Sequence, residues 1–404
     1  MTLMATNPIR LLRALGHGAL RVLGPIHEWS EGRASLALDA VEHGGRRGAV
    51  MCYTNPPVHQ IGNPGLDAML AALVRLAERG DVEFLILTWP CDPVHAGGDL
   101  KESLDRLTAT HLRRDELEAA GAPRDEIDAL YAWADGRLDK GQALYRAVRA
   151  LRMRTVGVCG GGLRFGGSAE VNLMADLLVG DSRSGMCFSE AMIGLIPGWA
   201  GVARAVTKAG AANARWMAQT AAQVMAPDLA RVGIYDAVVT IDEPLPRMGR
   251  SGDKAADAAR YADDLAAHDG RVWPALLAEG LRLATCALDD VPRIDPGTRP
   301  LLATAAQLDA EVRRRADPSS YAAVWGQTLK EAEPALTRLG RPLAPQSVAE
   351  LDALLGSAEP GGFDEDRFVE AEKLADARLY RDRRLEVGIR ATLEQRVADF
   401  RTIG

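Results

Sequence analysis

The stretch that decides the fold runs from Arg154 to Gly201 and reads RTVGVCGGGLRFGGSAEVNLMADLLVGDSRSGMCFSEAMIGLIPGWAG. It opens with an apolar segment at 155–159 that is typical of a buried strand. A glycine-rich turn follows at 160–167, a helix is expected to begin near Ser168, and a second buried strand is predicted at 177–180. Strand, turn, helix and strand in this order predict a βαβ unit, and therefore a parallel sheet with helices on its faces.

Two glutamates in this stretch are candidates for acid–base chemistry. Glu170 follows the glycine-rich turn, and Glu190 precedes a turn with the pattern Gly-x-Ile-Pro-Gly. A carboxylate pair suits such chemistry because one group takes a proton while the other presents one, and burial can move their pKa values apart. Two structural alternatives stay open. Glu170 could interact only with a helix N-terminus, and Glu190 could only cap a neighbouring turn.

Composition and charge restrict the class of protein. The 404 residues are 47% hydrophobic and 25% charged, which is typical of a soluble globular protein, and the net charge of −7 argues against a nucleic-acid binder. No run approaches the roughly 18 apolar residues of a membrane helix, and the N-terminus lacks the apolar core of a secretory signal. The five cysteines form no CxxC pair and the seven histidines no HxxxH spacing. We therefore expect a cytoplasmic protein with buried thiols and no bound metal.

The chain divides into three predicted regions. Residues 1–33 predict a short N-terminal helical lead-in whose helix ends around Gly24-Pro25. Residues 34–241 predict the α/β core, in which 103–150 form a long helical insert. From 242 to 404 the pattern is helical, and 364–401 predict one long closing helix.

The core repeats the strand–helix–strand pattern before the central stretch. Strands are predicted at 34–40, 48–53 and 84–89. A helix is expected at 66–79, because apolar residues recur there at helical spacing. The segment AGGDLKE at 96–102 is a second glycine turn, and its Asp99 is expected in the first turn of the next helix.

Four segments, in order, resemble the enoyl-CoA hydratase/isomerase (crotonase) superfamily. TNPPVHQIG at 54–62 is similar to the family's Asn-x-Pro turn, and AGGDLKE is similar to its AG-x-D-[IL]-K-E motif. Residues 154–180 resemble the strand, turn and GGG-x-E-L helix, and SEAMIGLIPGWAGVAR at 189–204 resembles PE-x-x-x-G-x-IPG-x-GG-x-x-R. The resemblance covers about 34–241 and the last helix. It implies an α/β fold with a crotonase-like ββα superhelix (spiral) core and an extended α-helical C-terminal region.

The resemblance also implies a site that binds a thioester carbonyl. By motif position, the backbone amides of Gly98 and Gly167 form an oxyanion hole, while Glu170 and Glu190 activate water. One such amide donor contributes about 10²–10³-fold in rate. Taken singly, the glycine pairs could be only tight strand-to-helix turns. Substrate contacts are expected from Ala96, Gly97, Asp99, Leu100, Gly166, Ile196, Pro197, Gly198 and Trp199.

Several positions depart from the family's pattern. Ser168 and Ala200 stand where the family has glycine, which implies a reshaped acyl pocket. Arg164 is unusual in its turn, and we expect it to face solvent rather than substrate. The chain length resembles the 3-hydroxyisobutyryl-CoA hydrolase branch. That branch, however, has an aspartate where this chain has Gly198, and it lacks a carboxylate at the position of Glu170.

The site residues favour hydration of an enoyl-CoA, or the reverse dehydration, with the CoA thioester as substrate and no cofactor. The first alternative is an acyl-CoA thioester or ring-opening hydrolase of the same superfamily. The second, from another class, is a non-catalytic crotonase-like binding subunit. The resemblance further implies a homotrimer or hexamer in which the closing helix packs on a neighbouring subunit, with neither nucleic acid nor membrane as a partner.

Overall fold

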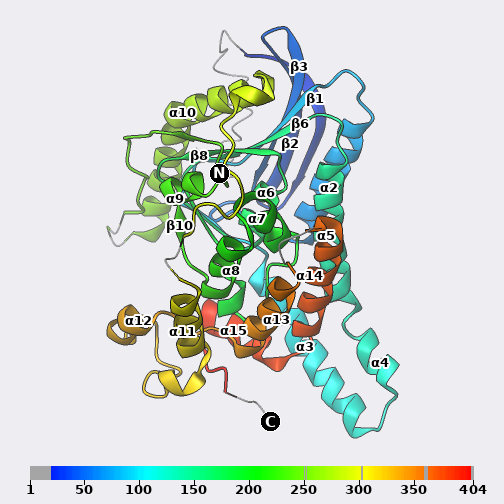
Figure 1. The fold of residues 1–404 in the computed structure, drawn as a ribbon, viewed down its shortest axis with the longest axis vertical. Coiled ribbons are helices and arrows are strands. Elements are labelled where there is room, and N and C mark those ends of the chain that lie inside the picture. Colours follow the sequence, from blue (N-terminus) through cyan, green and yellow to red (C-terminus); the bar gives the residue numbers. More distant parts are fainter. Residues whose placement is uncertain (1–19, 250, 252, 302–303, 359–362, 402–404) are drawn as a thin grey trace. The chain divides into compact units, whose positions relative to one another are not determined.

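The computed structural model describes residues 20–249, 251, 253–301, 304–358 and 363–401 (Figure 1). These residues form two compact units, each assembled from three separate segments of the chain. The sheet unit takes its described residues from 1–97, 143–186 and 224–295, and the helical unit takes them from 98–142, 187–223 and 296–404. The part of the predicted helical lead-in at 1–19 lies outside the described residues.

A seven-stranded sheet forms the centre of the sheet unit. Its strands, in spatial order, are β1 (Leu20–Glu31), β2 (Ala34–His43), β3 (Arg46–Thr54), β4 (Phe84–Thr88), β6 (Arg154–Cys159), β8 (Leu177–Asp181) and β11 (Ala237–Val239). The first three strands are antiparallel, and from β3 onward every neighbouring pair is parallel. The predicted parallel sheet is therefore confirmed.

A second sheet of short strands interleaves with the first along the chain. Its spatial order is β10 (Val224–Met225), β9 (Gly185–Cys187), β7 (Leu163–Phe165) and β5 (Val94–His95). In chain order, β4, β6 and β8 are followed by β5, β7 and β9, and then by helices α3 (Leu100–Ala119), α6 (Gly167–Leu173) and η1 (Glu190–Met192). This repeated strand–strand–helix order is the predicted ββα superhelix, so the fold class is confirmed.

The long helix α10 (Lys254–Thr285) supplies part of the core of the sheet unit. Strand β4 is buried along its whole length, as expected for a parallel strand covered on both faces. Trp273 and Leu276 of α10 join Ile86 and Val158 in one apolar cluster, and the Trp273 indole N–H donates to the Thr88 hydroxyl at 3.0 Å. Helix α2 (Asn63–Ala77) packs on β1 and β2 (Figure 1).

The segment Leu20–Glu31 is a strand, so the predicted helical lead-in at 1–33 is wrong there. It pairs with β2 from Leu20 opposite His43 to Glu31 opposite Ala34. The Gly24-Pro25 pair lies at two register irregularities in this edge strand. Proline is tolerated at edges and bulges because no ladder hydrogen bond needs its missing N–H.

The helical unit contains the predicted insert and most of the C-terminal region. Its helices are α3, α4 (Arg124–Ala129), the first part of α5 (Ala132–Arg149), α7 (Gly201–Ala209), α8 (Ala211–Thr220), α11 (Ala305–Ala316), α12 (Glu333–Leu339), α13 (Pro345–Gly356), α14 (Glu365–Leu379) and α15 (Arg383–Leu393). Helix α3 packs on α15, and α14 packs on α7 and α13. Among the described helices, none is long and apolar enough to cross a membrane.

The predicted closing helix at 364–401 is wrong as a single element. It consists of two helices, α14 and α15, that are separated at Tyr380–Asp382. The Asp382 carboxylate accepts a hydrogen bond from the Arg384 amide at 2.8 Å and so caps α15. An aspartate in this role favours the start of a new helix because it satisfies an N–H that has no partner within the helix.

Candidate functional site

The first glycine turn is held from two sides within the sheet unit. The Ala96 amide donates to the Val58 carbonyl at 2.6 Å, and the Gly97 carbonyl accepts from the Ile61 amide at 2.9 Å. A Cβ atom at Gly97 would lie 2.8 Å from the Gly167 amide nitrogen. Only glycine fits there, because backbone atoms cannot move aside. Two of the predicted site residues, Gly97 and Gly167, are thus packed against each other.

The second glycine turn leads directly into α6. Gly166 has φ 50° and ψ −127°, a combination that is essentially restricted to glycine. Gly167 is the first residue of the helix, and Glu170 lies one turn further on with only 3% of its surface exposed. The predicted site residues Gly166, Gly167 and Glu170 therefore occupy one short, buried segment.

Ser168, a departure from the family's glycine, connects the two turns. Its hydroxyl donates to the carbonyl of Ala96. The pairing of β5 with β7, which sets His95 opposite Arg164, adds a second connection. The serine therefore ties the backbone of the first turn to the helix that follows the second turn.

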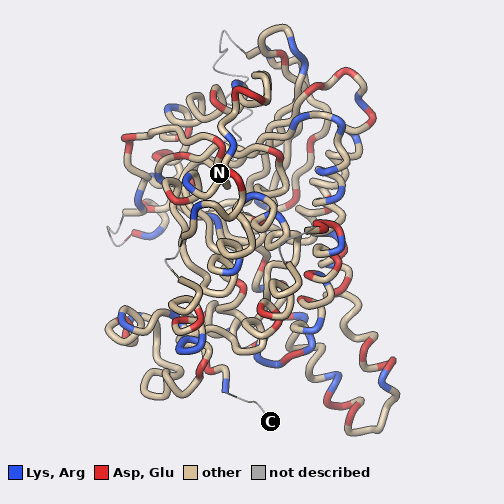
Figure 2. The backbone as a smooth tube through the Cα atoms, in the orientation of Figure 1, with Lys and Arg blue, Asp and Glu red and all other residues tan. Residues whose placement is uncertain are grey.

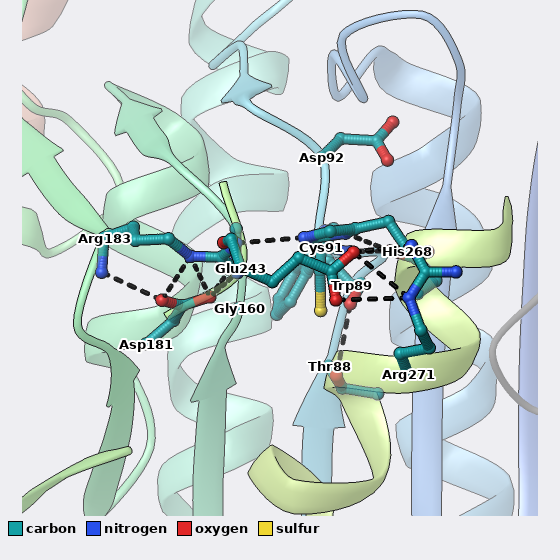
Figure 3. Close-up of polar contacts among 12 residues, drawn as sticks. Thr88, Trp89, Cys91, Asp92, Gly160, Asp181, Arg183, Glu243, His268 and Arg271 are labelled. Carbon is teal, nitrogen blue, oxygen red and sulfur yellow. Dashed lines mark hydrogen bonds and ion pairs between the residues drawn. The ribbon is translucent and has the colours of Figure 1, made fainter. Parts of the chain in front are cut away.

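Buried charged side chains hold the backbone within the second turn and a few residues before the first; Figure 3 shows Asp181, Gly160 and Cys91 among these residues. The Gly161 amide donates to the Asp181 carboxylate at 3.2 Å, and the Cys91 amide donates to the Asp269 carboxylate at 3.0 Å. Arg164 is completely buried and donates to the Gly160 carbonyl at 2.7 Å. The expectation that Arg164 faces solvent is therefore wrong. The sequence could not reveal its carbonyl partners, which depend on how the glycine turn folds back.

Two buried histidines, His59 and His95, stack on each other next to the first glycine turn. His59 accepts a hydrogen bond at Nδ1 from the Asn55 amide at 3.0 Å, so its Nε2 carries the proton and donates to Asp92 at 2.6 Å. His95 stacks on His59 with ring centroids 5.0 Å apart. Burial, with Arg164 and His59 close by, holds the pKa of His95 well below its usual value. His95 is accordingly a neutral core side chain.

Gly98 and Asp99 directly precede helix α3 in the helical unit. A Cβ atom at Gly98 would lie 2.6 Å from the Nη2 atom of Arg137. The Asp99 carboxylate caps α3 by accepting from the amides of Lys101 and Glu102, at 3.0 and 3.1 Å. Asp99 thus has a structural task, and the expected substrate contact from its side chain stays a prediction. The same holds for Leu100, the half-buried first residue of α3.

Glu190 and the Ile196–Trp199 turn also belong to the helical unit. Glu190 begins η1, is 8% exposed, and accepts hydrogen bonds at its backbone carbonyl from three amides, those of Ile193, Gly194 and Leu195. The Ile196 amide donates to the Asp376 carboxylate of α14 at 3.1 Å. The structure thus fixes the backbone of both segments.

The carboxylate of Asp376 also occupies the space beside Gly198. A Cβ atom at Gly198 would lie 2.5 Å from Asp376 Oδ2 and 2.9 Å from Leu138. Pro197 is buried, and the neighbouring Trp199 ring lies beneath the Arg137 guanidinium with its centroid 5.9 Å away. Sequence reasoning missed both Asp376 and Arg137, because each lies dozens of residues or more from the motif that it contacts.

Comparisons with known proteins point to the enoyl-CoA hydratase/isomerase family. The enoyl-CoA hydratase/isomerase family model matches residues 114–260. A curated relative, named "Probable enoyl-CoA hydratase echA8" of Mycobacterium leprae (strain TN), is 28% identical over 202 residues, which are 50% of this chain and 68% of that protein.

Two solved structures share the fold. An enoyl-CoA hydratase from Rhodobacter sphaeroides 2.4.1 superposes with a TM-score of 0.52 at 18% identity, and a carnitinyl-CoA dehydratase from Mycobacterium thermoresistibile with 0.52 at 16%. Each match covers 86% of this chain and 87% of the other. With its ββα superhelix and its two packed glycine turns, the chain has the fold of these enzymes and resembles the enoyl-CoA hydratase/isomerase (crotonase) superfamily in sequence.

Proposed function

We propose that the protein hydrates the double bond of an enoyl-CoA thioester, or catalyses the reverse dehydration. The observation that carries this proposal is the packing of Gly97 against the Gly167 amide, with Ser168 tying both turns together. The turn that leads into Gly98 and the turn that ends at Gly167 are the two that the motifs predict as oxyanion donors. Glu170 follows one helical turn later.

In the proposed mechanism, the amides of Gly98 and Gly167 donate to the thioester oxygen. Water adds to the β-carbon while a glutamate removes its proton, and the electron pair of the double bond moves toward the carbonyl. The negative charge that builds on the thioester oxygen is stabilised by the two N–H groups. A proton delivered to the α-carbon completes the addition, and Glu170 and Glu190 share the acid and base roles. The chemistry requires no cofactor, because CoA is part of the substrate.

Glutamine variants test the two carboxylates. Glu170→Gln and Glu190→Gln keep the side-chain shape but cannot transfer protons, so we expect each to lower kcat by about 10²–10⁴-fold. Turnover is measured on a panel of enoyl-CoA thioesters, with products identified by mass spectrometry. Glu118→Gln on the surface of α3, where the glutamate side chain is 49% exposed, serves as the control. Wild-type turnover by both site variants would exclude the mechanism.

Thioester hydrolysis is the second candidate, and one observation favours it. The carboxylate of Asp376 fills the space beside Gly198, where the resembling hydrolase branch carries an aspartate. Free CoA without a hydrated CoA ester among the products would select hydrolysis over hydration. If no thioester of the panel is converted at all, the result selects the non-catalytic binding subunit.

We propose in addition that the protein is a homotrimer or a hexamer. The support is the resemblance to the superfamily, which implies such assemblies. Sedimentation velocity measures the mass in solution directly, and a monomer at micromolar concentration would contradict this assembly.

A further inference from the structure

A buried guanidinium group lies directly beside Gly98. Arg137 comes from α5, is 4% exposed, and belongs with Gly98 to the helical unit. Its Nη2 atom lies 2.6 Å from the position of a Cβ at Gly98, while Cζ and Nε lie 3.6 and 3.9 Å away. The guanidinium therefore points its Nη2 end at this glycine.

The surroundings of Arg137 keep its charge in place. Its Nη1 atom lies 3.4 Å from one oxygen of Glu102, and the other oxygen of Glu102 lies 3.6 Å from Arg106 on the same helix, α3. These three groups together carry one positive charge. The guanidinium also lies over the ring of Trp199 at 5.9 Å, an arrangement that is favourable for a cation.

We propose that Arg137 stabilises the negative charge that develops on the thioester oxygen bound at the Gly98 amide. This inference rests on the proposed function. A Cβ atom lies about 2.5 Å from the nitrogen of its own residue, so Nη2 lies within about 5 Å of the Gly98 amide nitrogen. A full charge at that range, shielded from water, acts strongly on an oxygen that hydrogen-bonds to this amide. Arg137 stabilises the oxygen through the charge and position of its guanidinium and transfers no proton.

The effect of Arg137 grows as charge develops on the oxygen. Its loss should therefore lower kcat more than it raises KM. If the side chain only fills the space beside Gly98, its loss should not lower kcat more than it raises KM. A structural role also predicts that the bound thioester carbonyl is polarised equally with and without the charge.

The test uses cinnamoyl-CoA, whose absorption band moves to longer wavelength when its thioester oxygen is polarised. The probe is bound at saturation to the wild-type protein and to R137K, R137M and R137M/E102Q. The double variant removes the buried cation together with its partner, so it tests the idea even if R137M alone folds poorly. R106M is the matched control, because Arg106 shares Glu102 but is 49% exposed.

We expect R137M and R137M/E102Q to lose at least half of the wild-type band shift and about 10–100-fold in kcat, with KM changed less than about 3-fold. R137K should show an intermediate shift, and R106M the full one. A wild-type shift in R137M/E102Q would overturn the role of Arg137 and leave the oxyanion proposal intact. Absence of any shift with the wild-type protein would instead overturn the proposed function itself.

Discussion

At the scale of single residues, the motif glycines follow from sequence, while the side chains around them do not. Gly97 is glycine because a Cβ would strike the Gly167 amide, and Gly166 because of its positive φ. The requirement at Gly166 is local, whereas the one at Gly97 comes from a residue far along the chain, but both positions stand in recognisable glycine motifs. Arg137 and Asp376 lie dozens of residues or more along the chain from the turns that they contact. Nothing in their local sequence indicates these contacts. The site's backbone was predictable, whereas its electrostatic surroundings were not.

His95 should make the folded state sensitive to acid. Because burial holds its pKa well below the usual value, the folded protein leaves it neutral while the unfolded chain binds a proton below about pH 6.5. The unfolded state then binds more protons, so stability is present above that pH and is lost as the pH falls. The loss from this residue approaches, at most, about 1.4 kcal/mol per pH unit.

Urea denaturation at pH 7.5 and pH 5.5 measures this dependence. In His95→Gln, the drop in unfolding free energy between the two pH values should be smaller than in the wild type by about 1 kcal/mol. His43→Gln, at the end of β2, is the control and should keep the wild-type dependence. An unchanged drop in His95→Gln would show that other groups cause the acid sensitivity.

Gly198→Asp should not turn the site into that of the hydrolase branch. The new side chain would begin 2.5 Å from Asp376 Oδ2 and would bury a second carboxylate, at an expected cost of about 3–5 kcal/mol in unfolding free energy. Adding Asp376→Ser should recover part of that loss, since it removes one charge and shortens the side chain. Thermal unfolding of both variants measures these changes in stability. Wild-type stability of the single variant would contradict this packing.

At the scale of elements, most of the longer strands and helices were predictable, with β1 as an exception, and the short ones were not. Strands β3, β4, β6 and β8 follow their apolar runs closely. Strands of two or three residues, such as β5 and β7, have no periodicity to detect. Strand β1 was mistaken for helix because its Gly-Pro pair marks a bulge in an edge strand rather than a helix end. Prediction fails where pairing with distant residues, rather than local pattern, determines the conformation.

One carboxylate of helix α10 should stabilise the backbone that leads into the first glycine turn. Asp269 accepts from the Cys91 amide at 3.0 Å, and burial raises the pKa of its carboxyl group. Its charge is therefore costly, and Asp269→Asn, which keeps an acceptor oxygen, should change the unfolding free energy by less than about 1 kcal/mol. Asp269→Leu leaves a buried amide without an acceptor and should cost about 1–3 kcal/mol.

Thermal unfolding compares the two Asp269 variants with a control. Glu279→Gln lies on the same helix, where it forms a surface ion pair with Arg282 at 2.6 Å, and should be nearly neutral. If the leucine and asparagine variants prove equally stable, the hydrogen bond to Cys91 has no measurable value.

At the scale of the whole molecule, helical pattern does not determine which surface a helix covers. The sequence grouped everything after residue 242 into one helical region. In the structure α10 completes the core of the sheet unit, while α11 to α15 belong to the helical unit. Amphipathic spacing predicts that a segment is a helix with one apolar face. The partner of that face is decided by tertiary packing, which one sequence does not reveal.

The strand order of the large sheet has a consequence for how the protein is made. Its strands follow one another in space in the same order as along the chain, from β1 to β11. Each new strand leaving the ribosome can therefore pair with one that is already present, over roughly 10–40 s of synthesis at 5–20 residues per second. Asp269, whose carboxylate accepts a hydrogen bond from the Cys91 amide, lies on α10 and is translated after every strand of this sheet. The backbone at Cys91, which leads into the first glycine turn, is thus synthesised early and receives this hydrogen bond late.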